Sequence, residues 1–157
     1  MLGKIGRFVT GSSVGAVREA TDALRQAYLD CAQRARQLSR HADMAPQAYS
    51  RAGLEELAVA EQAQAQRLRE ALEAAGATVP TAQTESLPGG ALNHWARLVQ
   101  DLESHRLSAR HFRRLAVRFA EDLPGTAMLF DTLCREEQIH CERLRTLIAR
   151  ADPQALD

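Results

Sequence analysis

Apolar residues recur at steps of three and four along four long stretches of the chain, which is the spacing expected of one face of an α-helix. This pattern predicts helices over about residues 13–44, 46–75, 91–121 and 125–151. On the first of them the inward face comprises Val14, Val17, Thr21, Leu24, Tyr28, Cys31, Ala35 and Leu38. We therefore expect an all-α protein, with a flexible N-terminal tail over residues 1–11 and one helical domain over residues 12–152.

The breaks between these stretches differ in length, and the difference predicts a topology. Pro46 marks a short join between the first two helices, and Pro124 with Gly125 marks a short join between the last two. Residues 76–90, by contrast, contain two prolines and show no helical spacing. At about 3.3 Å per residue this stretch can span roughly 50 Å, which exceeds the length of about 45 Å for a thirty-residue helix. The sequence thus predicts a four-helix bundle of two antiparallel hairpins, joined by a long crossover between the second and third helices.

A short internal repeat places charged residues on two of the apolar stripes. The segments 61–69 and 137–145 carry the same residue at five of nine positions. Both begin with a carboxylate, Glu61 or Glu137, and have a polar partner three residues later, Gln64 or His140. Because positions i and i+3 lie on one face of a helix, each pair can point at the same place inside a bundle. The repeat therefore predicts a polar site in the core, supplied by the second and fourth helices.

The two segments, together with the predicted topology, resemble the rubrerythrin branch of the ferritin-like superfamily. In that family the second and fourth helices each supply a Glu-x-x-His motif and the other two helices each supply a glutamate, and together they hold two metal ions. The resemblance implies that Glu61, Glu103, Glu137 and His140 are ligands of iron or manganese. It also implies metal-dependent redox chemistry, either iron oxidation or the reduction of peroxide or oxygen.

The sequence departs from the family pattern at two ligand positions. Gln64 stands where the second helix of the family has histidine, and a neutral amide oxygen is a poor iron ligand beside imidazole. On the first helix, Thr21 occupies the stripe position at which the family has glutamate. A reduced metal site is therefore expected, with Gln64 and the stripe residue His105 as weaker candidate ligands.

Three arrangements of this reduced site remain open. In the first, a single metal ion is held by the four ligands that the resemblance implies. In the second, Arg106, one turn after Glu103, neutralises the carboxylates, and the bundle is metal-free and acts as a structural or protein-interaction module. In the third, a missing ligand is replaced by another residue near the core: His105, Cys31, Cys134 or Cys141.

Composition argues against several classes of partner and function. The chain has 157 residues with 20 basic and 20 acidic side chains, and a net charge of zero argues against a nucleic-acid binder. No stretch approaches the roughly 20 apolar residues of a membrane span, so no membrane partner is expected. Three widely spaced cysteines without a secretory signal predict reduced thiols and a cytoplasmic protein. No Cys-x-x-Cys pair is present, so a rubredoxin-like electron-transfer domain is not expected.

The third predicted helix is rich in arginine. Five of these residues are Arg106, Arg110, Arg113, Arg114 and Arg118. Because arginine is enriched at protein interfaces, we expect surface ion pairs and contacts between subunits, with a homodimer as the default state. An anion-binding face and an unidentified protein partner are the alternatives.

Overall fold

The computed structural model describes residues 11–82 and 92–152, with side chains in the first range from Val14 onward. These residues form four helices, α1 (Gly11–Asp43), α2 (Ala48–Ala74), α3 (His94–Phe119) and α4 (Pro124–Arg150). No strand occurs among the described residues, so the expectation of an all-helical bundle is confirmed for them. Of the expected tail only Gly11 is described, and it already belongs to α1; residues 1–10 lie outside the described ranges.

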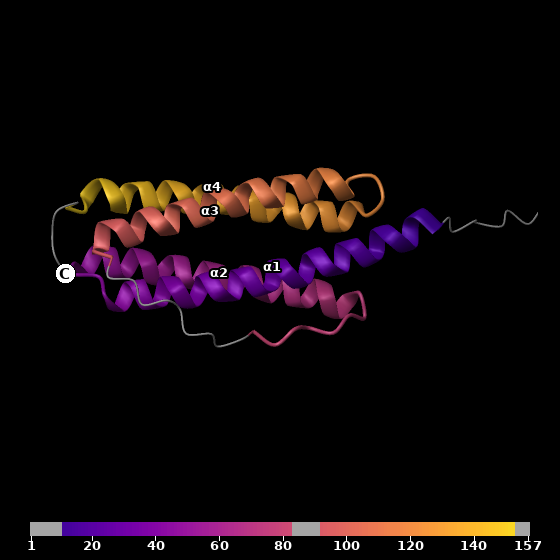
Figure 1. The fold of residues 1–157 in the computed structure, drawn as a ribbon, viewed down its shortest axis with the longest axis horizontal. Coiled ribbons are helices and arrows are strands. Elements are labelled where there is room, and N and C mark those ends of the chain that lie inside the picture. The colour runs from indigo at the N-terminus through magenta and orange to yellow at the C-terminus, as the bar shows by residue number, and fades with distance from the viewer. Residues whose placement is uncertain (1–10, 83–91, 153–157) are drawn as a thin grey trace, which may run out of the picture.

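The four helices pack as two pairs, α1 with α2 and α3 with α4 (Figure 1). The pairs meet along α1 and α3 on one side and along α2 and α4 on the other. On the first side, Gln37 donates to one oxygen of Asp101 and His41 Nδ1 lies beside the other, each at 2.7 Å. On the second side, Arg67 donates to both oxygens of Glu136. The helices therefore surround a common interior in the order α1, α2, α4, α3.

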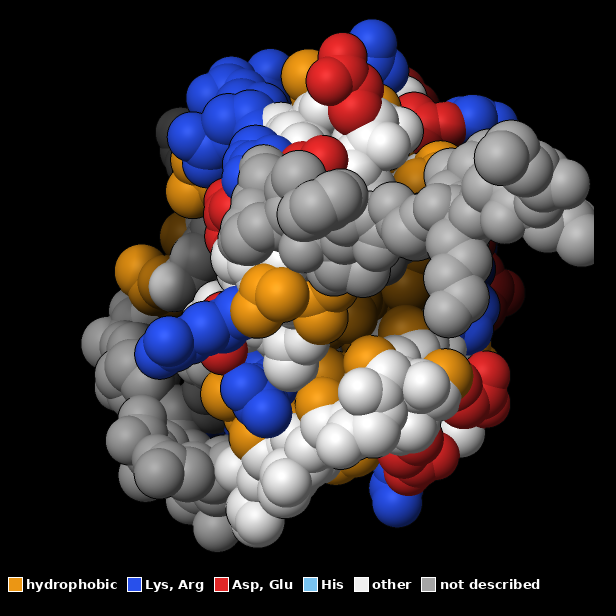
Figure 2. Space-filling view, turned by 90° about the vertical axis from the view of Figure 1, so that its right-hand side faces the viewer, with side chains coloured by type: hydrophobic (Ala, Val, Ile, Leu, Met, Phe, Trp, Pro, Cys, Tyr) orange, Lys and Arg blue, Asp and Glu red, His pale blue; other side chains and the backbone are white. Residues whose placement is uncertain are grey.

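Two apolar clusters fill this interior. One contains Phe112, Phe119 and Phe130, and the Phe130 ring stacks on the other two with centroids 5.9 and 6.2 Å apart. The other cluster is built from leucines and alanines of all four helices. Viewed from one end, apolar side chains are visible between the helices and charged side chains lie around the outside (Figure 2). Among the described residues, no helix is sufficiently long and apolar to cross a membrane.

A polar layer lies between the two apolar clusters. On α4, Leu133 belongs to the first cluster and Leu144 to the second, and the buried residues Glu137 and His140 fall between them. The same order holds on α2, where buried Glu61 lies between residues of the two clusters. Because buried charges are costly, the charged groups of this layer must be compensated by ion pairs, hydrogen bonds or a bound metal ion.

The helix ends follow from local residue types. The Asn93 side chain accepts a hydrogen bond from the Ala96 amide at 2.9 Å and caps α3. Gly76 follows α2 with φ of +67°, a left-handed conformation that glycine adopts without a steric penalty. Pro124 opens α4, where its missing amide hydrogen costs nothing because the first turn has no acceptor for it.

Replacing the cap of α3 is expected to weaken the fold moderately. In Asn93→Ala the Ala96 amide loses its side-chain acceptor, and such substitutions cost about 1 kcal/mol of stability. Urea unfolding followed by circular dichroism measures the loss, and Asn93→Ser, which keeps an acceptor, is the matched control. Equal stability of the alanine, serine and parent proteins would show that the cap contributes nothing.

The first turns of α1 differ from the sequence prediction. Val14 and Val17 were expected on the inward face, yet they are 65% and 49% exposed, and Ala16 and Ala20 are buried instead. The prediction assigned the larger apolar side chains to the core, whereas close approach of two helices favours small ones. From Leu24 onward the predicted and observed faces of α1 coincide at Cys31, Ala35 and Leu38.

Candidate metal centre

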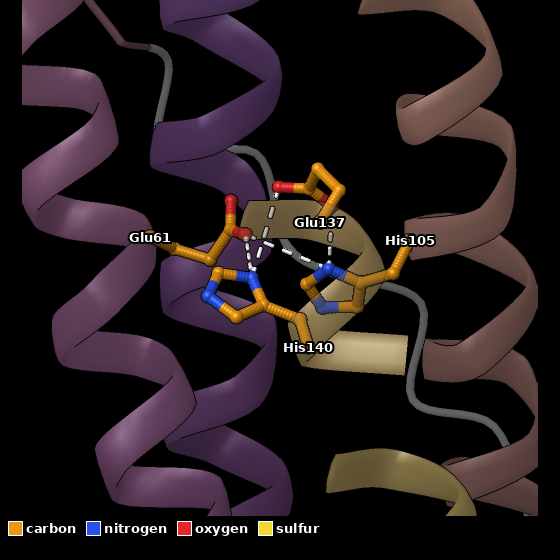
Figure 3. Close-up of side chains that lie close together, drawn as sticks. All are labelled: Glu61, His105, Glu137 and His140. Atoms are coloured by element: carbon orange, nitrogen blue, oxygen red, sulfur yellow. Dashed lines mark hydrogen bonds and ion pairs between the residues drawn. The ribbon is translucent and has the colours of Figure 1, made fainter. Parts of the chain in front are cut away.

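Four buried side chains from three helices point toward one another in the polar layer (Figure 3). Glu61 lies on α2, His105 on α3, and Glu137 and His140 on α4. Each offers one potential ligand atom, and these atoms all lie within 4.8 Å of one another. We call these four residues the Glu–His cluster. Each occupies a position where the helical spacing otherwise places a core side chain, which is why the fold directs all four inward.

Both histidines of the Glu–His cluster face both carboxylates. His105 Nδ1 lies 2.7 Å from Glu137 Oε2 and 3.5 Å from Glu61 Oε1. His140 Nδ1 lies 3.2 Å from Glu61 Oε1 and 3.8 Å from Glu137 Oε1. The two imidazole rings meet edge to face, with centroids 5.4 Å apart. The cluster is thus a compact group of two imidazoles and two carboxylates with no apolar side chain among them.

Three atoms of the cluster are buried and make no hydrogen bond: Glu61 Oε1, Glu137 Oε1 and His140 Nδ1. A buried polar atom without a partner costs about 1–3 kcal/mol, so native proteins rarely leave one. Here the two carboxylate oxygens lie 3.2 and 3.8 Å from the third atom, His140 Nδ1. A cation that accepted all three lone pairs would remove this cost in one step.

The donor set fits a transition-metal ion. Ligand atoms bound to one ion at about 2.0–2.2 Å can lie up to about 4.4 Å apart, so atoms already within 4.8 Å need only small side-chain shifts. Imidazole nitrogen suits iron and zinc, and carboxylate oxygen suits manganese.

No protein-family model matches this chain, and a comparison with curated proteins finds no match either.

Arg34 of α1 contacts both carboxylates from one side. Its Nε donates to Glu61 Oε2 at 3.0 Å, and one terminal nitrogen lies 3.6 Å from Glu137 Oε1. The same nitrogen lies 3.2 Å from Cys31 Sγ. Only 11% of the Arg34 side chain is exposed. Arg34 therefore holds the outer oxygen of Glu61 and leaves the inner oxygen, Oε1, directed at the histidines.

The surroundings give the two carboxylates different acidities. Burial would raise the pKa of Glu61, but the adjacent His140 ring and the Arg34 charge outweigh it and lower this pKa to about 2. Burial raises the pKa of Glu137, and the nearby Glu61 charge adds to the rise, against the hydrogen bond with His105. Although burial opposes its charge, Arg34 has a raised pKa because both carboxylates favour the guanidinium. Glu61 and Arg34 are therefore an ion pair, and Glu137 is the more readily protonated carboxylate.

Glu103, the third-helix ligand implied by the family resemblance, is not brought to the cluster. Its side chain is 54% exposed and lies 3.8 Å from Arg106, one turn along α3. Positions two apart on a helix do not share a face, so a helix that buries His105 turns position 103 toward solvent. Arg106 is exposed as well, so it does not neutralise the buried carboxylates; Arg34 contacts them instead.

Gln64 is buried near the cluster, but its amide is engaged elsewhere. Its oxygen accepts from Cys31 Sγ at 3.6 Å, and its nitrogen donates to Glu136 at 3.1 Å. On α1, the Thr21 hydroxyl donates to the backbone oxygen of Val17. Gln64 and Thr21 stand at the two positions where this sequence departs from the family pattern. Neither of them directs a ligand atom into the cluster.

None of the three cysteines joins the Glu–His cluster. All are free and buried, and burial raises the pKa of each thiol and so favours the protonated form. A thiol that stays protonated is a poor metal ligand, because the thiolate is the form that binds. Of the replacement ligands considered from the sequence, only His105 belongs to the cluster.

Arg34 is the residue at this site that the sequence analysis did not single out. It lies three residues after Cys31 and four before Leu38, both buried residues of the α1 stripe. That spacing already places it on or beside the inward face. Its charge favoured a surface position, but a long arginine side chain can bury its stem and direct its guanidinium at a buried carboxylate.

Proposed function

We propose that this protein is a ferritin-like four-helix bundle, made of two antiparallel hairpins with a long crossover between them. The pairing of α1 with α2 and of α3 with α4 supports this arrangement. In Figure 1 the colour runs in opposite directions along the two helices of each pair, which is also what antiparallel hairpins require. The repeated Glu-x-x-Gln and Glu-x-x-His segments face each other across the interior, as the resemblance to rubrerythrins implies.

We further propose that the protein binds a single iron or manganese ion at the Glu–His cluster. The observation that carries this proposal is the set of three buried donor atoms on Glu61, Glu137 and His140 that make no hydrogen bond in this structure. With His105 they give two nitrogen and two oxygen donors, a mixed set that suits iron or manganese and leaves further coordination positions free. A bound redox-active ion would supply one-electron chemistry toward oxygen or peroxide.

The surrounding residues would orient the donors. Until an ion binds, Arg34 holds the Glu61 carboxylate through Oε2, so that Oε1 points into the cluster. The 2.7 Å contact between His105 Nδ1 and Glu137 Oε2 fixes the ring against the carboxylate. The two apolar clusters lie on either side of this polar layer.

A metal-free polar core is the second candidate, and Arg34 favours it. A buried guanidinium that contacts Glu61 and Glu137 already compensates part of their charge without any cation. In that case the layer would specify how the four helices pack, and the function would lie on the surface.

Metal content distinguishes the two candidates. Protein purified without chelators, or incubated anaerobically with Fe²⁺ or Mn²⁺, is expected to hold about one equivalent of metal by elemental analysis. In the double variant Glu137→Gln, His140→Ala the metal should fall to background, because half of the four donors are removed. Circular dichroism establishes that the variant remains folded.

Glu103→Gln is the matched control for this experiment. It removes a carboxylate that the family resemblance implies as a ligand but that is exposed in this structure, so the metal content should not change. A parent protein without metal under every loading condition would support the metal-free core. Loss of metal in Glu103→Gln would instead place the ion somewhere other than the Glu–His cluster.

A further inference from the structure

A positive charge already contacts the carboxylates of the Glu–His cluster, and it opposes the entry of a second one. The guanidinium of Arg34 contacts both Glu61 and Glu137, at 3.0 and 3.6 Å. A divalent ion at the cluster would therefore lie only a few ångströms from a fixed cation in a region of low dielectric. Repulsion at such a distance is worth several kcal/mol at an effective dielectric constant of about 20. Metal binding is thus favoured by any movement of this guanidinium away from the carboxylates.

A pocket between α1 and α3 provides space for that movement. Its volume is about 310 Å³, and Arg34 is part of its lining. Polar side chains dominate the rest of the lining, and they include Asp30, Gln33 and Gln37 of α1 and Ser104 and Ser108 of α3. The pocket therefore lies next to the Arg34 side chain, on the surface side of the cluster, and can solvate a charged group.

Asp30 of this pocket offers Arg34 a second carboxylate. The two residues are four apart on α1, with the acid on the N-terminal side, which is the favourable order for a helical ion pair. Asp30 now accepts a hydrogen bond from Gln26 at 2.8 Å, whereas the ion pairs of Arg34 are with Glu61 and Glu137. Arg34 thus has an inner pair of carboxylates, which it contacts in this structure, and an outer carboxylate within the span of its long side chain.

We propose that Arg34 is a displaceable counter-ion of the metal site. When a divalent cation binds to the Glu–His cluster, the guanidinium turns into the α1–α3 pocket and pairs with Asp30. When the ion leaves, the guanidinium returns to Glu61 and Glu137 and keeps the buried carboxylates compensated. This inference rests on the proposed metal site, and it makes Arg34 a determinant of metal affinity, selecting ions that carry enough charge to displace it.

The first test replaces the counter-ion. Arg34→Gln keeps a hydrogen-bond donor for Glu61 but removes the charge, so Co²⁺, followed by its visible absorption, should bind at least about tenfold more tightly. Arg25→Gln is the matched control, because Arg25 is another α1 arginine, paired with Asp22, outside the cluster. It should leave the affinity unchanged.

The second test acts on the outer position without changing the cluster. Asp30→Asn removes the outer partner of Arg34. It should weaken Co²⁺ binding about twofold, because an ion pair between residues four apart on a helix changes an equilibrium constant by about that factor. Ser104→Phe fills the pocket and should weaken Co²⁺ binding more than Asp30→Asn does. Both substitutions should lose their effect when they are combined with Arg34→Gln, because the neutral glutamine has no charge to relocate.

The outcomes separate this inference from the proposed function. Tighter binding in Arg34→Gln, together with loss of the Asp30 and Ser104 effects in that background, supports displacement. If the parent binds Co²⁺ and Arg34→Gln binds it equally well or more weakly, the counter-ion role is wrong and the metal site remains. Absence of Co²⁺ binding in both proteins would overturn the metal site and the inference together. If Asp30→Asn and Ser104→Phe still weaken binding in the Arg34→Gln background, the guanidinium does not move into the α1–α3 pocket.

Discussion

Phe130→Ala is expected to destabilise the protein by about 3–5 kcal/mol, the usual cost of truncating a fully buried phenylalanine to alanine. Phe130 of α4 is fully buried, and its ring stacks between Phe112 and Phe119 of α3. Removing it deletes the aromatic contacts of the α3–α4 pair and leaves a cavity that rigid neighbouring helices cannot fill. Urea denaturation at equilibrium, with the unfolding free energy extrapolated to water, measures the loss.

The matched control for this substitution lies on the same helix. Met128→Ala removes a side chain of comparable size that is 71% exposed, two residues from Phe130. It should change the unfolding free energy by less than about 0.5 kcal/mol, as surface substitutions usually do. A loss in Phe130→Ala below about 1 kcal/mol would mean that the aromatic cluster packs loosely and is not the centre of the core.

Four-helix packing follows from the sequence because it depends on many weak and redundant signals. Each stripe has several apolar positions, so a few misassigned residues do not change the helix or its inward side. The first turns of α1 show the limit of this redundancy, since the exposed residues Val14 and Val17 were assigned to the core. Alanine gives little signal in a hydrophobic pattern, although Ala16 and Ala20 are the buried residues in these turns.

The candidate site was predicted less completely than the fold. Each site residue must be assigned individually to the inward or outward side of its helix, and no neighbouring residue corrects a wrong assignment. Glu61, Glu137 and His140 were identified from an internal repeat, in which two copies fix the phase together. Glu103 was taken from the family resemblance alone, and it lies on the solvent side of α3. His105 was considered only a weaker ligand, although its place on the apolar stripe already located it correctly.

Arg34 shows what spacing alone does not reveal. Its position beside the α1 stripe is visible in the sequence, but the choice between solvent and a buried carboxylate depends on which residues face it from α2 and α4. In this structure those residues are Glu61 and Glu137, and their combined charge stabilises the guanidinium in the interior. A metal-binding layer and a metal-free ion pair therefore share the same carboxylates, and the balance between them is set by one first-helix arginine.

Removing His105 should lower the affinity of the Glu–His cluster for a divalent ion by about a hundredfold or more. In His105→Ala one of the four donors is lost, and Glu137 loses the ring that lies 2.7 Å from its Oε2 and helps to fix its orientation. Loss of an outer contact alone commonly costs about 10- to 100-fold, so loss of a ligand should cost at least the upper end of that range. Competition of Co²⁺ with a coloured chelator gives the dissociation constants of the parent and the variant.

Unfolding provides an independent measurement of the same difference. An ion that binds only the folded protein stabilises it by about 2.7 kcal/mol at a hundred times its dissociation constant, so the parent should unfold at higher urea when Co²⁺ is present. At the same Co²⁺ concentration His105→Ala should show less than about 1 kcal/mol of this gain. His94→Ala is the matched control, because His94 is another buried histidine of α3 that lies outside the cluster, and it should keep the full gain. Equal stabilisation of the parent and His105→Ala would exclude His105 as a ligand and would leave Glu61, Glu137 and His140 as the only cluster donors.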